Sequence, residues 1–139
     1  MGQAKTAYDE YVMDHIKNAR SYRVLEQADR ELPVTNPMCG DKMTVQLLIE
    51  DGRVRDAAFQ CECCGISMAS ASMMMEWLQG RLVEEAADYA RGLLARLASR
   101  GEAEEGEAGE LERALFSIVR EHPSRARCAA LPWTALGAM

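Results

Sequence analysis

The chain has 139 residues, of which 48% are apolar, and its 22 acidic and 16 basic residues give a formal net charge of -6. This length suits one domain with a hydrophobic core and is too short for two. Because the Lys and Arg residues are scattered through an acidic chain, the composition argues against nucleic acid as a partner. No apolar stretch reaches the roughly 20 residues that cross a bilayer, and the first residues lack the apolar segment of a secretory signal. We therefore expect a cytoplasmic protein with no membrane partner.

The first half of the chain predicts one helix followed by a β-hairpin. Apolar residues at helical spacing predict an amphipathic helix over residues 5–20, and "LPVT" at 32–35 favours a short edge strand. From Met43 apolar and polar residues alternate, and "EDGR" is a hairpin turn signal before the second strand, "VRDAAF". The alternation breaks at Ala57 and Ala58, which predicts a bulge there.

The second half predicts helices. Residues 65–80 are rich in Ala, Ser and Met, residues 82–99 carry apolar positions three or four apart, and helical spacing returns between residues 111 and 136. Residues 100–110 are a charged, low-complexity link that we expect to be flexible. Strands grouped before helices predict a single α+β domain with helices packed on one face of a small antiparallel sheet.

The five cysteines are the main indication of function. They are Cys39, Cys61, Cys63, Cys64 and Cys128. In a cytoplasmic protein we expect metal-binding or sulfur-handling thiols rather than disulfides, because the cytosol keeps thiols reduced. Each of the two histidines, His15 and His122, is distant from this cluster in the sequence, and we expect them on helix surfaces or at caps.

The predicted hairpin brings the first four cysteines to one end of the sheet. Cys39 lies just before the first strand, and the other three follow the second, whereas Cys128 is in the last helix and the sequence does not place it. Three thiols and the carboxylate of Asp41 make a four-coordinate set for zinc, and thiolates are also ligands of iron-sulfur clusters. A simple Asx-type turn also explains "CGD", so this triplet alone does not decide.

Three segments carry a resemblance to a known family. "NPMCGD", "CGISMASASMMMEW" and "SRARCAALPWTAL" resemble the signature segments of the U-type iron-sulfur scaffold family, which comprises IscU, SufU and the N-terminal domain of NifU. The resemblance runs from Tyr8 to Leu136 and is closest to SufU. Arg127 stands where the IscU branch has a histidine, the chaperone-binding segment of that branch is missing, and "GELERALFSIVREHPSRARC" resembles an additional segment of SufU proteins.

The resemblance implies a fold and a ligand set. The implied fold is the SufE/NifU-like one, a three-stranded antiparallel sheet with helices packed on it and the site at one exposed end. The implied ligands of Zn2+ or of a [2Fe-2S] cluster are Cys39, Asp41, Cys64 and Cys128. Cys39 also matches the catalytic cysteine that accepts sulfur from a pyridoxal-phosphate cysteine desulfurase. Gly40 gives the Cys39 loop its backbone freedom.

The resemblance also implies partners. These are a SufS-like cysteine desulfurase and downstream iron-sulfur assembly or carrier proteins, and we expect a monomer when the protein is free. Two roles stay open, a scaffold for [2Fe-2S] assembly and a zinc-dependent sulfurtransferase that relays sulfur onward. Arg125 and Arg127 flank Cys128 and are candidates for supporting a thiolate or meeting an acidic partner surface, although solvated arginines are the more common case.

One departure from the family concerns the stretch before Cys64. Where relatives usually have "GEGC", this chain has "CECC", so Cys61 and Cys63 replace glycines. These two thiols are candidates for additional ligands or for redox chemistry, and they can also be inert replacements. Two other functions therefore stay open, a structural zinc-binding interaction module and a thiol-disulfide redox protein that uses Cys63 with Cys64 or with Cys61.

Overall fold

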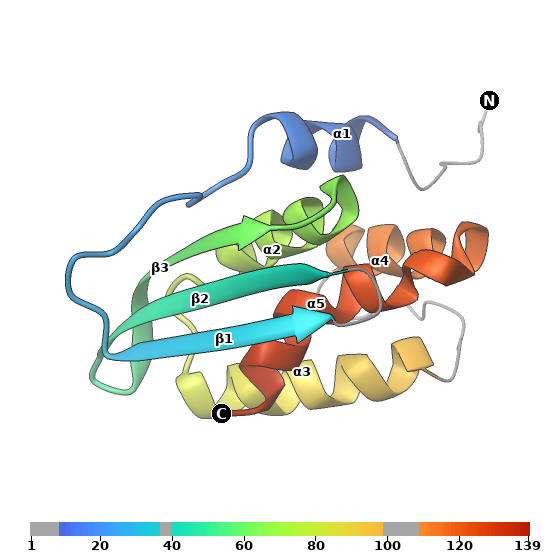
Figure 1. Cartoon of the computed structure of the whole chain (residues 1–139). Coiled ribbons are helices and arrows are strands. Elements are labelled where there is room, and N and C mark those ends of the chain that lie inside the picture. The colour runs from blue at the N-terminus through green and yellow to red at the C-terminus, as the bar shows by residue number, and fades with distance from the viewer. Residues whose placement is uncertain (1–8, 37–39, 99–108) are drawn as a thin grey trace.

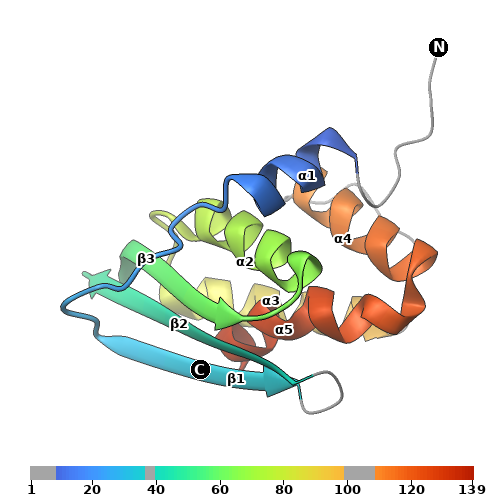
Figure 2. The ribbon, with the colours of Figure 1, turned by 45° about the horizontal axis from the view of Figure 1, so that its top comes forward.

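A computed structural model describes residues 9–36, 40–98 and 109–139. In chain order its elements are α1 (Glu10–Lys17), β1 (Arg30–Asn36), β2 (Asp41–Glu50), β3 (Arg53–Glu62), α2 (Gly65–Leu78), α3 (Val83–Ala98), α4 (Glu110–Glu121), the 3-10 turn η1 (Pro123–Arg125) and α5 (Ala126–Gly137). The three strands form one antiparallel sheet in the order β1-β2-β3, and the helices gather on one side of it (Figures 1 and 2). The predicted α+β class is confirmed.

The hairpin turn between β2 and β3 follows from two residues. Asp51 and Gly52 have φ values of 55° and 75°, the left-handed pair that matches the twist of two adjacent strands. Gly adopts this conformation without steric cost, and Asp tolerates it better than most residues do. The turn signal in the sequence therefore sets the register that carries Asp41 and Glu62 to the same end of the hairpin.

The bulge in this hairpin lies earlier than expected. The register shifts between Leu48 and Ile49 and leaves Arg55 as the extra residue, whereas Ala57 and Ala58 pair regularly. The expectation of a bulge at the two alanines was therefore wrong. Both alanines are fully buried, because the segment before β1 covers the second face of the sheet at this level, so the broken alternation reflects burial on both faces.

That covering segment is held by hydrogen bonds to β2 and β3. The side-chain oxygen of Gln46 accepts from the N–H of Leu25 at 2.9 Å, and the N–H of Phe59 donates to the carbonyl of Ser21 at 3.0 Å. Gln46 is only 4% exposed, and its side-chain nitrogen donates to the carbonyl of Leu25 and to Oε1 of Glu31, so its polar atoms are satisfied. The sheet thus packs helices on one face and a strip of irregular chain on part of the other.

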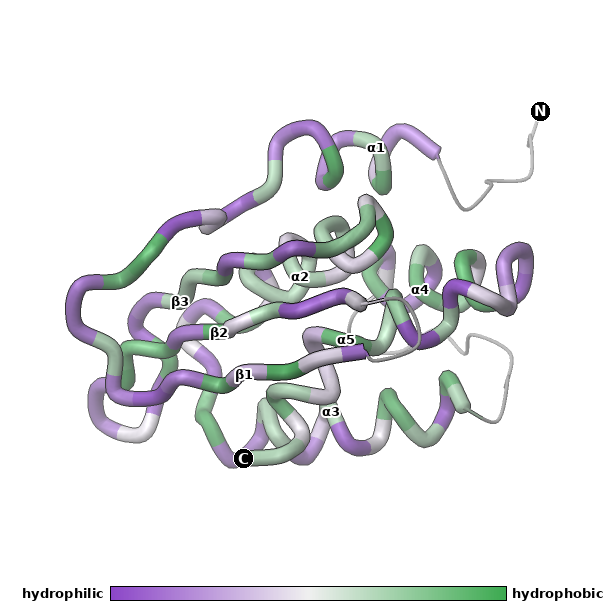
Figure 3. The backbone as a smooth tube through the Cα atoms, in the orientation of Figure 1, coloured by the Kyte–Doolittle hydropathy of each residue, from purple (hydrophilic) through white to green (hydrophobic). Residues whose placement is uncertain are grey.

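The core lies between the sheet and helices α2 and α5. α2 is apolar around most of its circumference, which Figure 3 shows as mainly green and white colour, and its three consecutive methionines, Met73 to Met75, are all buried. A helix that is apolar all round must be surrounded by other elements. Accordingly α2 packs against α1, β3 and α5, and α5 also packs against β1, β2 and α3. This central position of α2 and α5 fixes the site described below.

The predicted helices match the observed ones with shifted ends. α1 begins after the N-cap Asp9, whose carboxylate accepts from the N–H of Val12 at 3.1 Å, and it ends at Lys17 rather than at residue 20. Residues 5–8 of the predicted helix and most of the predicted acidic link lie outside the described residues. Within the described ranges, no helix is both long enough and apolar enough to cross a membrane.

Candidate metal centre

Three side chains from distant segments meet at the end of the sheet where β2 begins. The ligand atoms of Asp41, Cys64 and Cys128 all lie within 4.8 Å of one another. Asp41 is the first residue of β2, Cys64 is the N-cap of α2, and Cys128 lies in the first turn of α5. The structure therefore brings together three of the four residues for which the resemblance implied a ligand role, including the cysteine that the sequence could not place.

Asp41 is positioned by the turn that precedes it. Gly40 has a φ of 75°, and its N–H donates to the carbonyl of Asn36 at 2.8 Å, closing the connection from β1 to β2. Glycine is favoured at such a φ because it has no Cβ, and a Cβ at this position would meet no atom within 4 Å. Asp41 then pairs with Asn36 across the sheet and is only 6% exposed, so its carboxylate is aimed into the protein.

Cys64 owes its electrostatic environment to the helix that it caps. Burial raises the pKa of its thiol, but hydrogen bonds from the backbone N–H and hydroxyl of Ser67, from Cys128 and from the N–H of Ile66 outweigh burial, and the pKa lies below its ordinary value. The first N–H groups of a helix have no partner within the helix and stabilise negative charge. The start of α2 therefore favours the thiolate that a metal requires.

The backbone carbonyl of Cys128 accepts its hydrogen bond from a serine of α2 instead of from its own helix. Pro132 lies four residues further along α5 and has no N–H to donate to the carbonyl of Cys128. The hydroxyl of Ser67 lies 3.1 Å from that carbonyl and supplies a donor instead. Next to it, the hydroxyl of Ser70 donates to the carbonyl of Ala129 at 2.6 Å. Ser67 and Ser70 of α2 thus hold the first turn of α5, so that Cys128 lies next to Asp41 and Cys64.

Ser67 links all three candidate ligands. Besides its contact with the carbonyl of Cys128, its hydroxyl lies 3.1 Å from Oδ2 of Asp41 and 3.7 Å from Sγ of Cys64, and Ser67 is fully buried. Ser67 was not among the site residues expected from the sequence. Its position three residues after an N-capping cysteine was the available signal, because N3 of a helix faces the cap.

The geometry and chemistry of this group fit a thiophilic metal ion. Two thiolates bound to one Zn2+ lie about 3.7 Å apart, so a spread of 4.8 Å among the three ligand atoms requires only a small contraction. Thiolates and carboxylates are both ligands of Zn2+, and thiolates also hold iron-sulfur clusters. Cys39, the proposed fourth ligand, lies outside the described residues.

The two additional cysteines are not part of this group. Cys61 and Cys63 form a disulfide with each other, and their Cα atoms are 5.4 Å apart. The expectation of reduced thiols was wrong for this pair, because the extended end of β3 places the two side chains on the same face, within bonding distance. In the described chain, the non-glycine residues with positive φ are Ser21 and Asp51. Cys61 and Cys63 therefore do not have a positive φ, so replacing glycine at these positions does not strain the backbone.

The two arginines beside Cys128 are exposed, whereas Cys128 itself is buried. Arg125 is in η1, and Arg127 is in the first turn of α5. Arg127 borders a shallow hollow formed with Asn36, Leu131 and their neighbours. Both side chains therefore belong to the surface next to the centre.

The fold and the site together define an α+β domain in which two cysteines and a carboxylate converge at one end of a three-stranded sheet. A profile of the NifU-like N terminal domain matches residues 7–129, so the chain belongs to this family, which includes IscU and SufU.

Two curated relatives match almost the whole chain. It is 34% identical to the zinc-dependent sulfurtransferase SufU of Bacillus subtilis over 94% of this chain and 87% of that protein. It is 35% identical to the iron-sulfur cluster assembly scaffold protein IscU of Thermotoga maritima over 95% of this chain and 91% of that one. A crystal structure described as an iron-sulfur cluster assembly scaffold for the SUF system of Fervidobacterium islandicum superimposes with a TM-score of 0.83, at 28% identity and 95% coverage of both chains.

Proposed function

We propose that this protein accepts persulfide sulfur from a cysteine desulfurase at Cys39 and assembles it into a [2Fe-2S] cluster or relays it onward in cytoplasmic iron-sulfur cluster assembly. The observation that carries this proposal is the convergence of Asp41, Cys64 and Cys128 within 4.8 Å. In the sequence only Gly40 separates Cys39 from Asp41. The names of the relatives support both branches of the proposal, a zinc-dependent sulfurtransferase and a cluster scaffold.

In the resting protein Cys39, Asp41, Cys64 and Cys128 would hold Zn2+. The ion would keep its thiolate ligands deprotonated at neutral pH. Ser67 orients the Asp41 carboxylate, and the N-terminus of α2 stabilises negative charge at Cys64. These residues hold one side of the centre, while Gly40 gives the backbone before Asp41 the freedom that an incoming sulfur donor requires.

The sulfur transfer itself is a thiol exchange. A thiolate of the protein attacks the terminal sulfur of the desulfurase persulfide, the sulfur-sulfur bond breaks, and the desulfurase thiolate leaves. The surface next to the centre carries Arg125 and Arg127, which suit an acidic docking surface on the desulfurase. Iron and sulfide would then be cargo of the same ligand set, and the carboxylate of Asp41 would bind iron less firmly than a fourth thiolate does.

The test is persulfide formation under anaerobic conditions. The full chain is incubated with a SufS-like cysteine desulfurase and cysteine, and intact and peptide masses locate the added sulfur. With the Cys61–Cys63 pair kept as the disulfide, we expect one added sulfur on Cys39 in the wild type and none in Cys39→Ser, whereas Cys61→Ser should still take up one sulfur. Ferrous iron is then added, and measurement of zinc, iron and acid-labile sulfide separates relay from scaffold. Tightly held zinc with no sulfur uptake would overturn the proposal in favour of a structural zinc module.

A further inference from the structure

The disulfide between Cys61 and Cys63 lies directly beside the metal centre. Cys61 lies one residue before the end of β3. Cys63 immediately precedes Cys64, and Cys64 is not in a disulfide. Both cysteines of the pair are half-buried, so a small thiol can reach them. The described chain therefore holds an oxidised pair of sulfurs next to Cys64 and Cys128, neither of which is in a disulfide.

The strand register orders the two cysteines relative to the centre. Lys42 pairs with Glu62, so Cys63 follows β3 at the level where Asp41 begins β2, while Cys61 pairs one step further away, with Met43. Cys63 is thus nearer to the ligands than Cys61 is, both along the chain and across the sheet. Such an arrangement suits an acceptor thiol at Cys63 and a resolving thiol at Cys61.

The proposed function requires a two-electron reduction that a pair of thiols can carry out. The outer sulfur of a persulfide is called sulfane sulfur. It must gain two electrons to become sulfide, which is the form that iron binds. A dithiol that closes to a disulfide supplies two electrons. The stoichiometry of one cysteine pair therefore matches the release of one sulfide.

We propose that the reduced Cys61–Cys63 pair converts the sulfane sulfur received by the centre into sulfide and becomes the disulfide seen in the structure. This inference rests on the proposed function, because that function supplies the persulfide. The metal ligands are not consumed, and the substrate of the pair is a protein-bound persulfide on a thiol of the centre.

The reaction proceeds in two balanced steps. First, the Cys63 sulfur attacks the outer sulfur of the persulfide, so that Cys63 becomes the persulfide and the first thiol regains a proton. Second, the Cys61 sulfur attacks Sγ of Cys63, the bond to the outer sulfur breaks, and that sulfur leaves with its electron pair and the Cys61 proton as hydrogen sulfide. The pair loses two electrons and the sulfane sulfur gains them. An external dithiol reductant then restores the pair for another cycle.

The experiment follows sulfide and disulfide together. The full chain is reduced, freed of reductant under anaerobic conditions, loaded by a desulfurase with cysteine, and separated from both. A parallel sample is loaded with inorganic polysulfide. We expect the wild type to release one sulfide per chain while the Cys61–Cys63 disulfide forms, as read by the methylene blue reaction and by masses after alkylation. Cys61→Ser should retain the sulfur as a persulfide on Cys63, and Cys63→Ser should retain it on the first acceptor.

Glu62→Gln is the matched control, because Glu62 lies between the two cysteines and is exposed. We expect it to release sulfide as the wild type does. Sulfide release by Cys61→Ser at the wild-type rate, or a stable persulfide on the wild type, overturns the inference and leaves the proposed function intact. Failure of the desulfurase to load any sample overturns the proposed function instead, and the polysulfide-loaded wild type then decides the inference by the same readouts.

Discussion

The hydroxyl of Ser67 lies 3.1 Å from Oδ2 of Asp41, and it is the one side-chain hydrogen bond that connects α2 to the carboxylate of the candidate centre within the described chain. Ser67 also contacts Sγ of Cys64 and the carbonyl of Cys128. It has one hydroxyl hydrogen, so it can donate to only one of the carboxylate, the carbonyl and the sulfur at a time. Ser67 therefore orients the three candidate ligands.

We predict that Ser67→Ala weakens zinc binding about 10-fold to 100-fold, the usual cost of losing an outer partner of a metal ligand. All four proposed ligands remain in this variant, so zinc stoichiometry should stay the same. Competition with a chelator of known affinity measures the change. Ser117→Ala is the control, because Ser117 is also buried but lies on α4. Equal zinc affinity of Ser67→Ala and the wild type would contradict the positioning role.

The backbone at Gly40 gives a second prediction. Its φ is 75°, and a methyl group added to its Cα would have no atom within 4 Å, so Gly40→Ala meets backbone strain and no clash. We expect it to lower the free energy of unfolding by about 1 kcal/mol. Gly40→Asn should cost less, because Asn tolerates the left-handed region better. Urea unfolding of both variants measures the order, and an equal or larger loss for Asn would contradict the assigned conformation.

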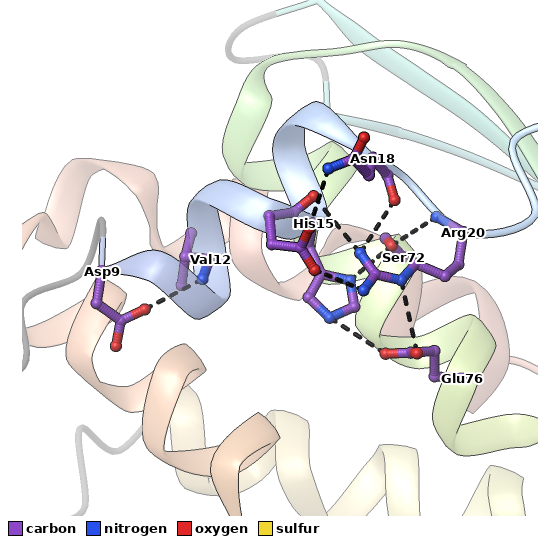
Figure 4. A network of polar contacts seen from close by, with 8 residues as sticks. Asp9, Val12, His15, Asn18, Arg20, Ser72 and Glu76 are labelled. Carbon is purple, nitrogen blue, oxygen red and sulfur yellow. Dashed lines mark hydrogen bonds and ion pairs between the residues drawn. The ribbon is translucent and has the colours of Figure 1, made fainter.

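His15 joins α1 to α2 through a chain of hydrogen bonds (Figure 4). Oγ of Ser72 accepts from the N–H of Arg20 at 2.8 Å and lies 2.6 Å from Nδ1 of His15. On the other side of the ring, Nε2 lies 3.2 Å from Oε1 of Glu76. A carboxylate can only accept, so the ring proton of the neutral histidine lies on Nε2, and Nδ1 accepts from the hydroxyl of Ser72. The expectation of a surface position for His15 was wrong, since its side chain is only 1% exposed.

This burial predicts a pH dependence of stability. Burial lowers the pKa of His15 and the charge of Arg20 lowers it further, against the opposing charges of Glu76 and Asp14. Below the ordinary value of 6.5 the unfolded chain binds a proton that the folded chain resists. The free energy of unfolding should therefore fall as the pH drops from about 6.5 towards the lower folded pKa, and be independent of His15 above that window.

Urea unfolding of the metal-free protein at about pH 7.5 and about pH 5.5 measures this dependence. The groups that face the ring are Ser72 and Glu76 of α2, Tyr11 and Asp14 of α1, and Arg20. His15→Gln keeps a polar side chain but does not titrate, so its loss of stability between the two pH values should be smaller than that of the wild type. An identical loss would assign the pH dependence to other groups.

The contrast between Asp41 and Cys128 shows what the sequence could predict. Hydrophobic alternation and the "EDGR" turn predicted the hairpin because both are local signals, and the hairpin in turn placed Asp41 near Cys64. Cys128 could not be placed from its own neighbours, because its position depends on how α5 packs against α2 and the sheet. The resemblance to a family supplied this long-range information.

Local sequence patterns could not predict which polar residues are buried. Single polar residues such as His15 and Ser67 sit within amphipathic or apolar stretches, and the sequence does not show whether a partner on another helix satisfies them. The disulfide between Cys61 and Cys63 was considered only as one alternative, for a different reason. The expectation of reduced thiols rested on a cellular compartment, whereas pairing depends on the local geometry at the end of β3.

A buried carboxylate between α3 and α4 gives the last prediction. Glu112 is 2% exposed, its oxygens lie 2.8 and 3.2 Å from the guanidinium nitrogens of Arg96, and the hydroxyl of Tyr89 donates to it. Burial raises the pKa of this carboxyl, but the contacts with Arg96 and Tyr89 outweigh burial and hold the pKa below its ordinary value. The native state therefore depends on the charged form.

We predict that Glu112→Gln lowers the free energy of unfolding by about 1–3 kcal/mol, because the amide nitrogen cannot accept from Arg96 or Tyr89 and leaves a buried donor without a partner. Glu110→Gln is the control. It removes an exposed contact with Arg113 within α4, and the expected loss is at most about 1 kcal/mol. Urea unfolding near neutral pH compares the two. If both variants lose the same stability, the Glu112 carboxylate does not join α3 to α4 in the way that its contacts indicate.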